Sequence, residues 1–192
     1  AKEFNFEMEY LDTHAIRARL NTERYFHGLR DSHGFHFHPL NYCLGVAELI
    51  EAKGGILYEN SPMIRVESQG DRHHVVTQQG VIDCGNVVHC CGGYGGPEFG
   101  RLRRAFLPIA TYVVLTEHLG DRLRDTIRTT DAVGDNRRAS DYYRVVDGDR
   151  LLWGGHITTR NVQDEKRLAH MLTDDILNVF PQLRGLQIEK AW

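Results

Sequence analysis

The sequence predicts an α+β protein in which a mixed or antiparallel sheet is flanked by helices. Residues 63–83 alternate between apolar and polar in three short runs joined by glycine-containing turns, which is typical of a β-meander. Residues 142–155 contain two apolar runs separated by an Asp-Gly turn, a strong hairpin signal. Residues 164–180 carry apolar side chains at helical spacing and end at Pro181.

Composition sets the class of protein and excludes several partners. The chain has 192 residues, 41% of them hydrophobic, which is enough to bury a core in one or two domains. Its net charge of −3 argues against a nucleic-acid or membrane-surface partner, and no apolar run reaches the ~20 residues of a membrane span. The cysteines show no C-x-x-C spacing, so we expect small buried thiols in the reducing cytoplasm: Cys43, Cys84, Cys90 and Cys91.

The first forty residues are weakly patterned. A helix is expected to begin near Asp12 or Thr13, either of which suits an N-cap, and residues 21–34 are expected to be a connection. On an extended segment His36 and His38 share a face, where two imidazoles can meet one metal ion. No matching Cys, Asp or Glu pattern lies nearby, so we predict no metal site and interpret these histidines as hydrogen-bonded or exposed.

The clearest helix begins at Pro39, because proline suits the first helical position. Gly54 and Gly55 end it, and residues 56–58 are expected to form a short strand of the sheet on which the helix packs. The apolar side chains that predict it recur at helical spacing: Leu40, Cys43, Leu44, Ala47 and Ile50.

After the meander, residues 87–91 are apolar enough to predict a strand that is buried on both faces. The glycines that follow permit either a flexible turn or a close approach of the backbone to something flat and bulky. A short basic helix is expected over residues 99–106, a strand over 111–116 and a helical turn over 122–127. Trp153-Gly154-Gly155 is interpreted as packing and turn geometry.

Several short segments follow one another in a characteristic order: His38-Pro39, Ala52-Lys53-Gly54-Gly55, Val87 to Tyr94, Pro108 with Thr111 to Glu117, Asp141 to Arg144, and Leu151 to Gly155. Through nearly all 192 residues this succession resembles the middle of the flavin-dependent amine and amino-acid oxidases of the D-amino-acid oxidase (DAO) type. That superfamily includes glycine, sarcosine and γ-glutamylputrescine oxidases.

The resemblance implies FAD as the cofactor, bound in part by this chain. Cys90, Cys91, Gly92 and Gly93 stand where an Ala-Thr-Gly-Ala-like strand end approaches the dinucleotide in that family. Met63 stands where the family usually has a valine whose backbone meets the adenine. The family's G-x-G-x-x-G fingerprint does not occur in this sequence, so we expect an internal piece of a longer flavoprotein.

The implied organisation has three parts. Residues 1–34 are a connecting or helical segment, residues 35–100 part of an FAD-binding α/β region, and residues 101–192 a substrate-binding sheet with a covering helix. The implied reaction is oxidation of a small amine or amino acid by hydride transfer to flavin N5, giving an imine. The isolated chain is expected to be inactive. The alternative is a non-catalytic binding or interaction domain that keeps the fold without a complete flavin site.

Strand alternation places Tyr142 and Arg144 on one face and Tyr143 on the other. We predict that Tyr142 and Arg144 are catalytic and substrate-binding residues. Tyr142 would hydrogen-bond the substrate, and Arg144 would pair with a carboxylate through its two-pronged guanidinium. The alternative is that Tyr142 packs in the core and Arg144 is a surface charge. Tyr112 and His156 are further candidates for substrate binding.

Overall fold

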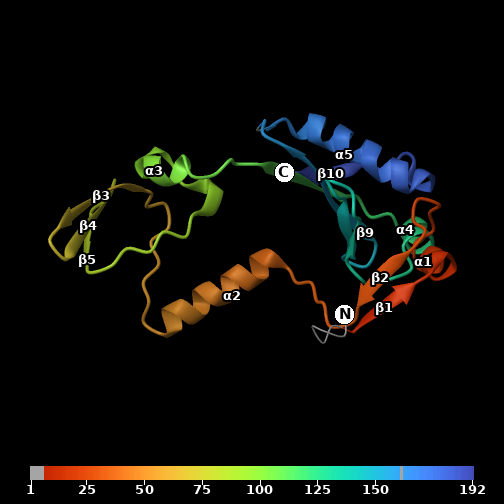
Figure 1. Cartoon of the computed structure of the whole chain (residues 1–192), viewed down its shortest axis with the longest axis horizontal. Helices are drawn as coiled ribbons and strands as arrows, with labels where there is room; N and C mark the ends of the chain where they lie inside the picture. Colours follow the sequence, from red (N-terminus) through yellow and green to blue (C-terminus); the bar gives the residue numbers. More distant parts are fainter. Residues whose placement is uncertain (1–6, 161) are drawn as a thin grey trace. The chain divides into compact units, whose positions relative to one another are not determined.

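The structure, a computed structural model, describes residues 7–160 and 162–192 of the chain (Figure 1). The chain divides into two compact units. We call the part formed by the first 36 residues and residues 109–192 unit 1, and residues 37–108 unit 2. The segment expected to be a connection thus belongs with the C-terminal sheet.

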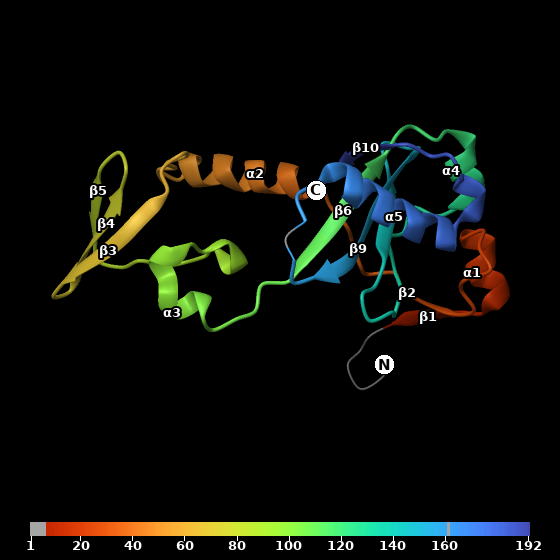
Figure 2. The same ribbon diagram turned by 90° about the horizontal axis from the view of Figure 1, so that it is seen from above.

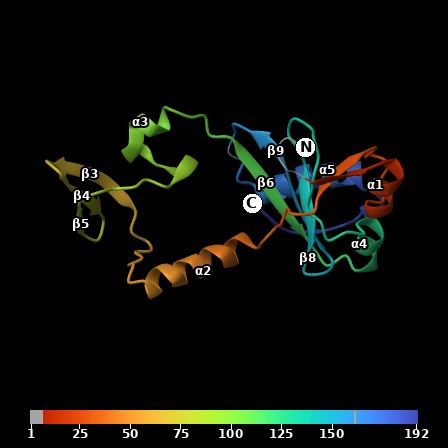
Figure 3. The ribbon, with the colours of Figure 1, turned by 60° about the horizontal axis from the view of Figure 1, so that its bottom comes forward.

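Unit 1 is built on a five-stranded antiparallel sheet with the strand order β10-β6-β9-β8-β7. Figure 3 shows its long strands β6, β8 and β9. Its three long strands confirm the predicted ones, and β7 and β10 are short additions that local pattern did not reveal. The strands are β6 (Ala110–Thr116), β7 (Val133–Gly134), β8 (Tyr142–Val146), β9 (Arg150–Thr158) and β10 (Ile188–Ala191).

The predicted hairpin joins β8 to β9. Asp147 has φ 50° and Gly148 has φ 82°. Two consecutive residues in the left-handed region give a turn whose twist matches that of the strands it joins, which is why Asp-Gly is favoured there.

Helix α5 (Glu165–Val179) covers one face of this sheet and contacts β6, β9 and β10 (Figure 2). The Asp164 carboxylate accepts hydrogen bonds from the N–H groups of Lys166 and Arg167, and so caps the first turn. The helix buries the stripe Leu168, Leu172, Ile176 and Val179. On the sheet side, Trp153 stacks on Tyr143 with ring centroids 4.4 Å apart. This layer is the core of unit 1.

The N-terminal part of unit 1 holds helix α1 (Thr13–Arg19), capped by Asp12 as predicted. It lies between two strands that pair antiparallel, β1 (Met8–Leu11) and β2 (Gly28–Asp31). The prediction that residues 21–34 are only a connection was therefore wrong. They contain β2, which pairs with β1, and the two strands are separated in the sequence by α1. The predicted helical turn after β6 is α4 (Asp121–Thr126).

Unit 2 confirms the predicted helix and meander. Helix α2 (Pro39–Ala52) is capped by the His38 ring, which accepts a hydrogen bond from the N–H of Asn41. The meander consists of β3 (Met63–Gln69), β4 (Arg72–Thr77) and β5 (Val81–Cys84). The predicted basic helix shortens to α3 (Gly100–Arg103), preceded by single 3-10 turns at Gly92–Tyr94 and Pro97–Phe99.

Four predictions for unit 2 were wrong. Residues 56–58 and 87–91 form no strand, and Val88 is 83% exposed. A strand needs a neighbour for its N–H and C=O groups, and no described residue pairs with either segment. The cysteines were expected to be buried, but Cys43, Cys90 and Cys91 are exposed and Cys84 is half-buried. None of the described side chains of unit 2 is fully buried, so this unit offers no core that could cover them. For the same reason α2 exposes the apolar face that was expected to pack on a sheet.

The predicted α+β class, with mainly antiparallel sheets and few helices, is confirmed. In the described part of the chain, no helix combines the length and apolarity that a membrane crossing requires.

Candidate functional site

The two faces of the five-stranded sheet differ sharply in burial. Along β6, Tyr112, Val114 and Thr116 are buried, whereas Thr111, Val113 and Leu115 between them are only partly buried or exposed. Along β8, Tyr143 is buried, and Tyr142 and Arg144 lie on the opposite side. We call the side turned away from α5 the open face. It carries the pair that alternation predicted.

Tyr142 lies flat on the open face. It is paired with Gly154 in the β8–β9 ladder, and a Cβ atom at Gly154 would overlap the Tyr142 ring. The absence of a side chain at Gly154 is therefore what lets the ring rest on the neighbouring strand. The Tyr142 hydroxyl lies 3.1 Å from the Oγ1 atom of Thr111 on β6, and the side chain is 41% exposed. The ring is fixed while its polar end stays accessible.

Arg144 is oriented by His36. A guanidinium N–H of Arg144 donates to Nδ1 of His36 over 2.7 Å, and Nε2 of His36 lies 3.1 Å from the carbonyl oxygen of Thr130. Arginine has no acceptor, so Nδ1 must accept, and the ring proton must sit on Nε2, from where it donates to Thr130. The arrangement selects one neutral tautomer of His36.

Tyr112 lies on the face covered by α5. Its side chain is 4% exposed, and its hydroxyl donates to the Arg160 carbonyl over 2.8 Å and accepts from the Val162 N–H over 2.9 Å. The hydroxyl therefore holds the connection that leads from β9 to α5. The structure does not bring it together with Tyr142 and Arg144.

His156 also lies toward α5. It adopts a left-handed backbone with φ 49°, and its Nε2 atom is 2.7 Å from an oxygen of Asp175 on α5. Burial raises the pKa of the Asp175 carboxyl, an effect that His156 and Arg137 oppose. Arg137 in turn contacts both Asp135 and Asp141. His156 thus belongs to a charge network that joins the sheet to its helix.

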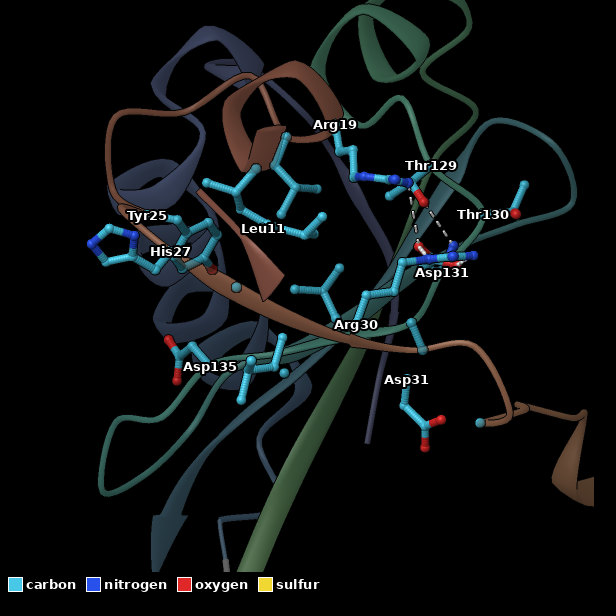
Figure 4. A pocket seen from close by; sticks show the side chains of 18 of the residues that line it. Leu11, Arg19, Tyr25, His27, Arg30, Asp31, Thr129, Thr130, Asp131 and Asp135 are labelled. Carbon is cyan, nitrogen blue, oxygen red and sulfur yellow. Dashed lines mark hydrogen bonds and ion pairs between the residues drawn. The ribbon is translucent and has the colours of Figure 1, made fainter. Parts of the chain in front are cut away.

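A pocket of about 990 Å³ lies between α1, the β1–β2 pair and residues 129–136, all within unit 1 (Figure 4). Arg19 and Arg30 point to Asp131 at its wall, and the Arg30 Nε atom is 2.8 Å from the carboxylate. This guanidinium holds the pKa of Asp131 below its usual range. His36 and Thr130 also line the pocket. His36, which orients Arg144, therefore also lines this pocket.

The two histidines considered as metal ligands have separate uses. His36 bonds Arg144 and Thr130, and His38 caps α2. Among the described residues no group of three His, Cys, Asp or Glu side chains is placed to hold a metal ion.

The predicted cofactor segment of unit 2 presents an uncovered backbone. Gly92 has φ 52°, which favours glycine, and a Cβ atom at Gly92 or Gly93 would meet no other atom within 4 Å. Cys90 and Cys91 are exposed, and Met63 is half-buried at the start of β3. Exposed glycines and small side chains suit one wall of a dinucleotide site. These residues fit FAD in that sense.

Three contributors to the open face were not found from the sequence. Thr111 and Gly154 meet Tyr142 only through strand register, and His36 meets Arg144 across 108 residues of chain. The usable signal in the sequence is the glycine pair after Trp153, which by itself indicates only packing and turn geometry. The register of the sheet pairs Gly154 with Tyr142, so the missing side chain at Gly154 leaves room for the Tyr142 ring.

Comparison with known proteins agrees with the resemblance drawn from the motifs. The sequence model of the DAO family, described as "FAD dependent oxidoreductase", matches residues 1–192. The chain is 33% identical over 190 residues to gamma-glutamylputrescine oxidoreductase of Escherichia coli, covering 98% of this chain and 44% of that protein. It is 29% identical to the probable oxidoreductase OrdL of Haemophilus influenzae, covering 100% and 44%. The chain thus spans less than half the length of these relatives.

Two solved structures share the fold at low sequence identity. One is the L-proline dehydrogenase from P. horikoshii, with a TM-score of 0.76 and 15% identity, covering 100% of this chain and 53% of that one. The other is the glycine oxidase from Geobacillus kaustophilus, with a TM-score of 0.73 and 16% identity, covering 100% and 51%. The chain therefore shares the arrangement of helices and strands of these two proteins.

Proposed function

Because this chain belongs to the DAO family of FAD-dependent oxidoreductases, we propose that its whole protein oxidises a small amine or amino acid to an imine. The cofactor of the family is FAD, which supplies the hydride acceptor, flavin N5, when bound. The observation that carries the proposal is the pairing of Tyr142 and Arg144 on the open face of the unit 1 sheet. The work of this chain is to bind and orient the substrate on that face.

Arg144 is the proposed anchor for a substrate carboxylate. A guanidinium presents its N–H donors in a fixed plane that matches two carboxylate oxygens, and such charge-assisted bonds are stronger than neutral ones. Its bond to His36 sets the plane before substrate arrives. The names of the relatives point to substrates of this kind, since γ-glutamylputrescine, proline and glycine all carry a carboxylate and an amine.

Tyr142 is the proposed second contact. Its hydroxyl is accessible, and Thr111 can exchange the role of donor and acceptor with it. The half-buried Val113, Leu115 and Leu152 lie on the same face and give it an apolar floor. An apolar floor limits water near a substrate and strengthens its polar contacts.

Met63, Cys90, Cys91, Gly92 and Gly93 are the proposed contribution of unit 2 to FAD binding. The exposure of Gly92 and Gly93 and the open space beside their Cα atoms support this role, because a ligand can approach the backbone there. The cytoplasm, suggested by the spacing of the cysteines, is the proposed compartment. We also expect the isolated 192-residue chain to be inactive.

The test is Arg144→Ala in the full-length enzyme with FAD bound. Losing a hydrogen-bonded ionic contact costs about 1.5–3 kcal/mol, which corresponds to roughly 10–100-fold in kcat/KM. We expect this loss for an amine that carries a carboxylate and a much smaller one for its carboxamide analogue. Steady-state kinetics on both substrates measures the difference.

Arg138→Ala, at an exposed position in the segment before β8, is the matched control and is expected to leave both substrates unaffected. An equal loss on both substrates with Arg144→Ala would show that Arg144 does not bind the carboxylate. A bound flavin without amine turnover would favour the non-catalytic alternative.

A further inference from the structure

We propose that His36 is a positioning residue for substrate binding, which holds the Arg144 guanidinium in the plane needed for a carboxylate. The inference rests on the proposed role of Arg144 and adds a residue from a distant part of the chain. His36 lies 108 residues before Arg144, in the segment that precedes α2. His36 would not contact the substrate itself and would act on its binding only through Arg144.

The contact to Arg144 is short and directed. The N–H of Arg144 meets Nδ1 of His36 over 2.7 Å, which is a strong hydrogen bond for a charged donor. The imidazole ring is rigid, so fixing its other nitrogen fixes the direction of Nδ1 as well. That second nitrogen donates to the Thr130 carbonyl over 3.1 Å.

The Thr130 carbonyl is itself held in place. The next residue, Asp131, accepts a hydrogen bond from Arg30 on β2 over 2.8 Å, and its N–H donates to Oγ1 of Thr129 over 3.1 Å. The carbonyl that accepts the hydrogen bond from His36 therefore belongs to a segment that is bonded to β2. Through its hydrogen bond, His36 passes this fixed position on to the Arg144 guanidinium.

Orientation is a better use of this contact than stability. His36 is exposed and Arg144 is only partly buried, and polar contacts that face water add little to folding. A long arginine side chain has many rotamers, and restricting it before binding lowers the entropic cost of capturing a ligand. The restriction requires an acceptor facing Arg144 and a donor facing Thr130. A neutral imidazole provides both.

The experiment uses the full-length enzyme with FAD bound, an amine substrate that carries a carboxylate and the matching carboxamide. For His36→Ala we expect KM for the carboxylate substrate to rise roughly 3–10-fold, the effect of losing a pre-oriented side chain. We expect kcat and the KM of the carboxamide to change less than about 2-fold, because His36→Ala leaves Arg144 and Tyr142 in place and the carboxamide carries no charge for Arg144 to bind.

His36→Gln is the rescue variant. Its carboxamide oxygen can accept from Arg144 while its NH₂ group donates to Thr130, so we expect KM to stay near that of the unchanged enzyme. His33→Ala is the control, because His33 is exposed in the same segment and makes its contacts to Asp31 instead. If His36→Ala does not fold, His36→Phe, which keeps a ring without nitrogen atoms, provides the same comparison.

Two failures can be told apart. If Arg144→Ala does not lower kcat/KM more for the carboxylate substrate than for the carboxamide, the proposed function of Arg144 fails and the role of His36 fails with it. If Arg144→Ala does lower kcat/KM selectively for the carboxylate substrate, but His36→Ala leaves KM unchanged or alters both substrates equally, only the positioning role is overturned. Adding His36→Ala to Arg144→Ala is expected to have no further effect on the carboxylate substrate, and an additive loss would also overturn it.

Discussion

Tyr142 and Tyr143 are neighbours of the same residue type, yet they lie on the two faces of one sheet and have different environments. Tyr143 stacks on Trp153 beneath α5, and burial raises the pKa of its hydroxyl. Tyr142 lies on Gly154 with its hydroxyl beside Thr111 and accessible to solvent. The covered face is a packed core and the open face a polar surface with an apolar floor. Residue type alone assigns neither role.

The largest effect is expected on the covered face. Trp153 is fully buried between Tyr143 and Phe180, so Trp153→Ala should lower the free energy of unfolding of this chain by about 3–5 kcal/mol. Urea unfolding followed by far-UV circular dichroism measures it. Trp192→Ala, at a side chain that is 58% exposed, should cost far less. Equal losses would show that the α5 layer is not the core of unit 1.

A smaller effect is expected where the open face depends on a glycine. Gly154→Ala forces the Tyr142 ring off β9, which should cost about 1–3 kcal/mol in unfolding free energy, as overpacking typically does. In the full-length enzyme it should also raise KM. Gly134→Ala is the control in the same sheet, because a Cβ atom there meets nothing within 4 Å.

The pairing of Tyr142 with Gly154 can be checked directly. In the double variant Tyr142→Ala with Gly154→Ala the overlap is gone, so its unfolding free energy should equal that of Tyr142→Ala alone. If Gly154→Ala were as costly without the Tyr142 ring as with it, the ring would not rest on that glycine.

Local pattern predicted the long elements because they carry their own signals. Alternation defined β6, β8 and β9, and helical spacing with caps defined α2 and α5. The short strands β1, β2, β7 and β10 have no such signal, since each has four residues or fewer and is fixed by its partner strand rather than by its own pattern. The same limit explains residues 87–91, whose apolar run predicted a strand although no described residue pairs with it.

The two long helices show what periodicity leaves open. Helices α2 and α5 have similar lengths and apolar side chains at helical spacing, but α5 buries its apolar stripe and α2 buries none of its residues. An apolar stripe predicts a helix and one face of it, not the element that covers that face. For the site, alternation likewise placed Tyr142 with Arg144 but assigned Tyr112 and His156 no face. The bonds of His36 to Arg144 and of Tyr142 to Thr111 depend on tertiary contacts.

The central claim is that the open face, and not the covered one, binds the substrate. The most direct test is a comparison of Tyr142→Phe with Tyr112→Phe, each of which removes one hydroxyl from this sheet in the full-length enzyme. Tyr142→Phe should lower kcat/KM for the amine by roughly 5-fold or more, the worth of about one hydrogen bond, with little loss of stability.

Tyr112→Phe leaves the Val162 N–H without its acceptor, so it should cost about 1–3 kcal/mol of unfolding free energy and leave kcat/KM of the folded enzyme nearly unchanged. The reverse pattern, with kinetics altered by Tyr112→Phe and stability by Tyr142→Phe, would contradict the assignment of the two faces.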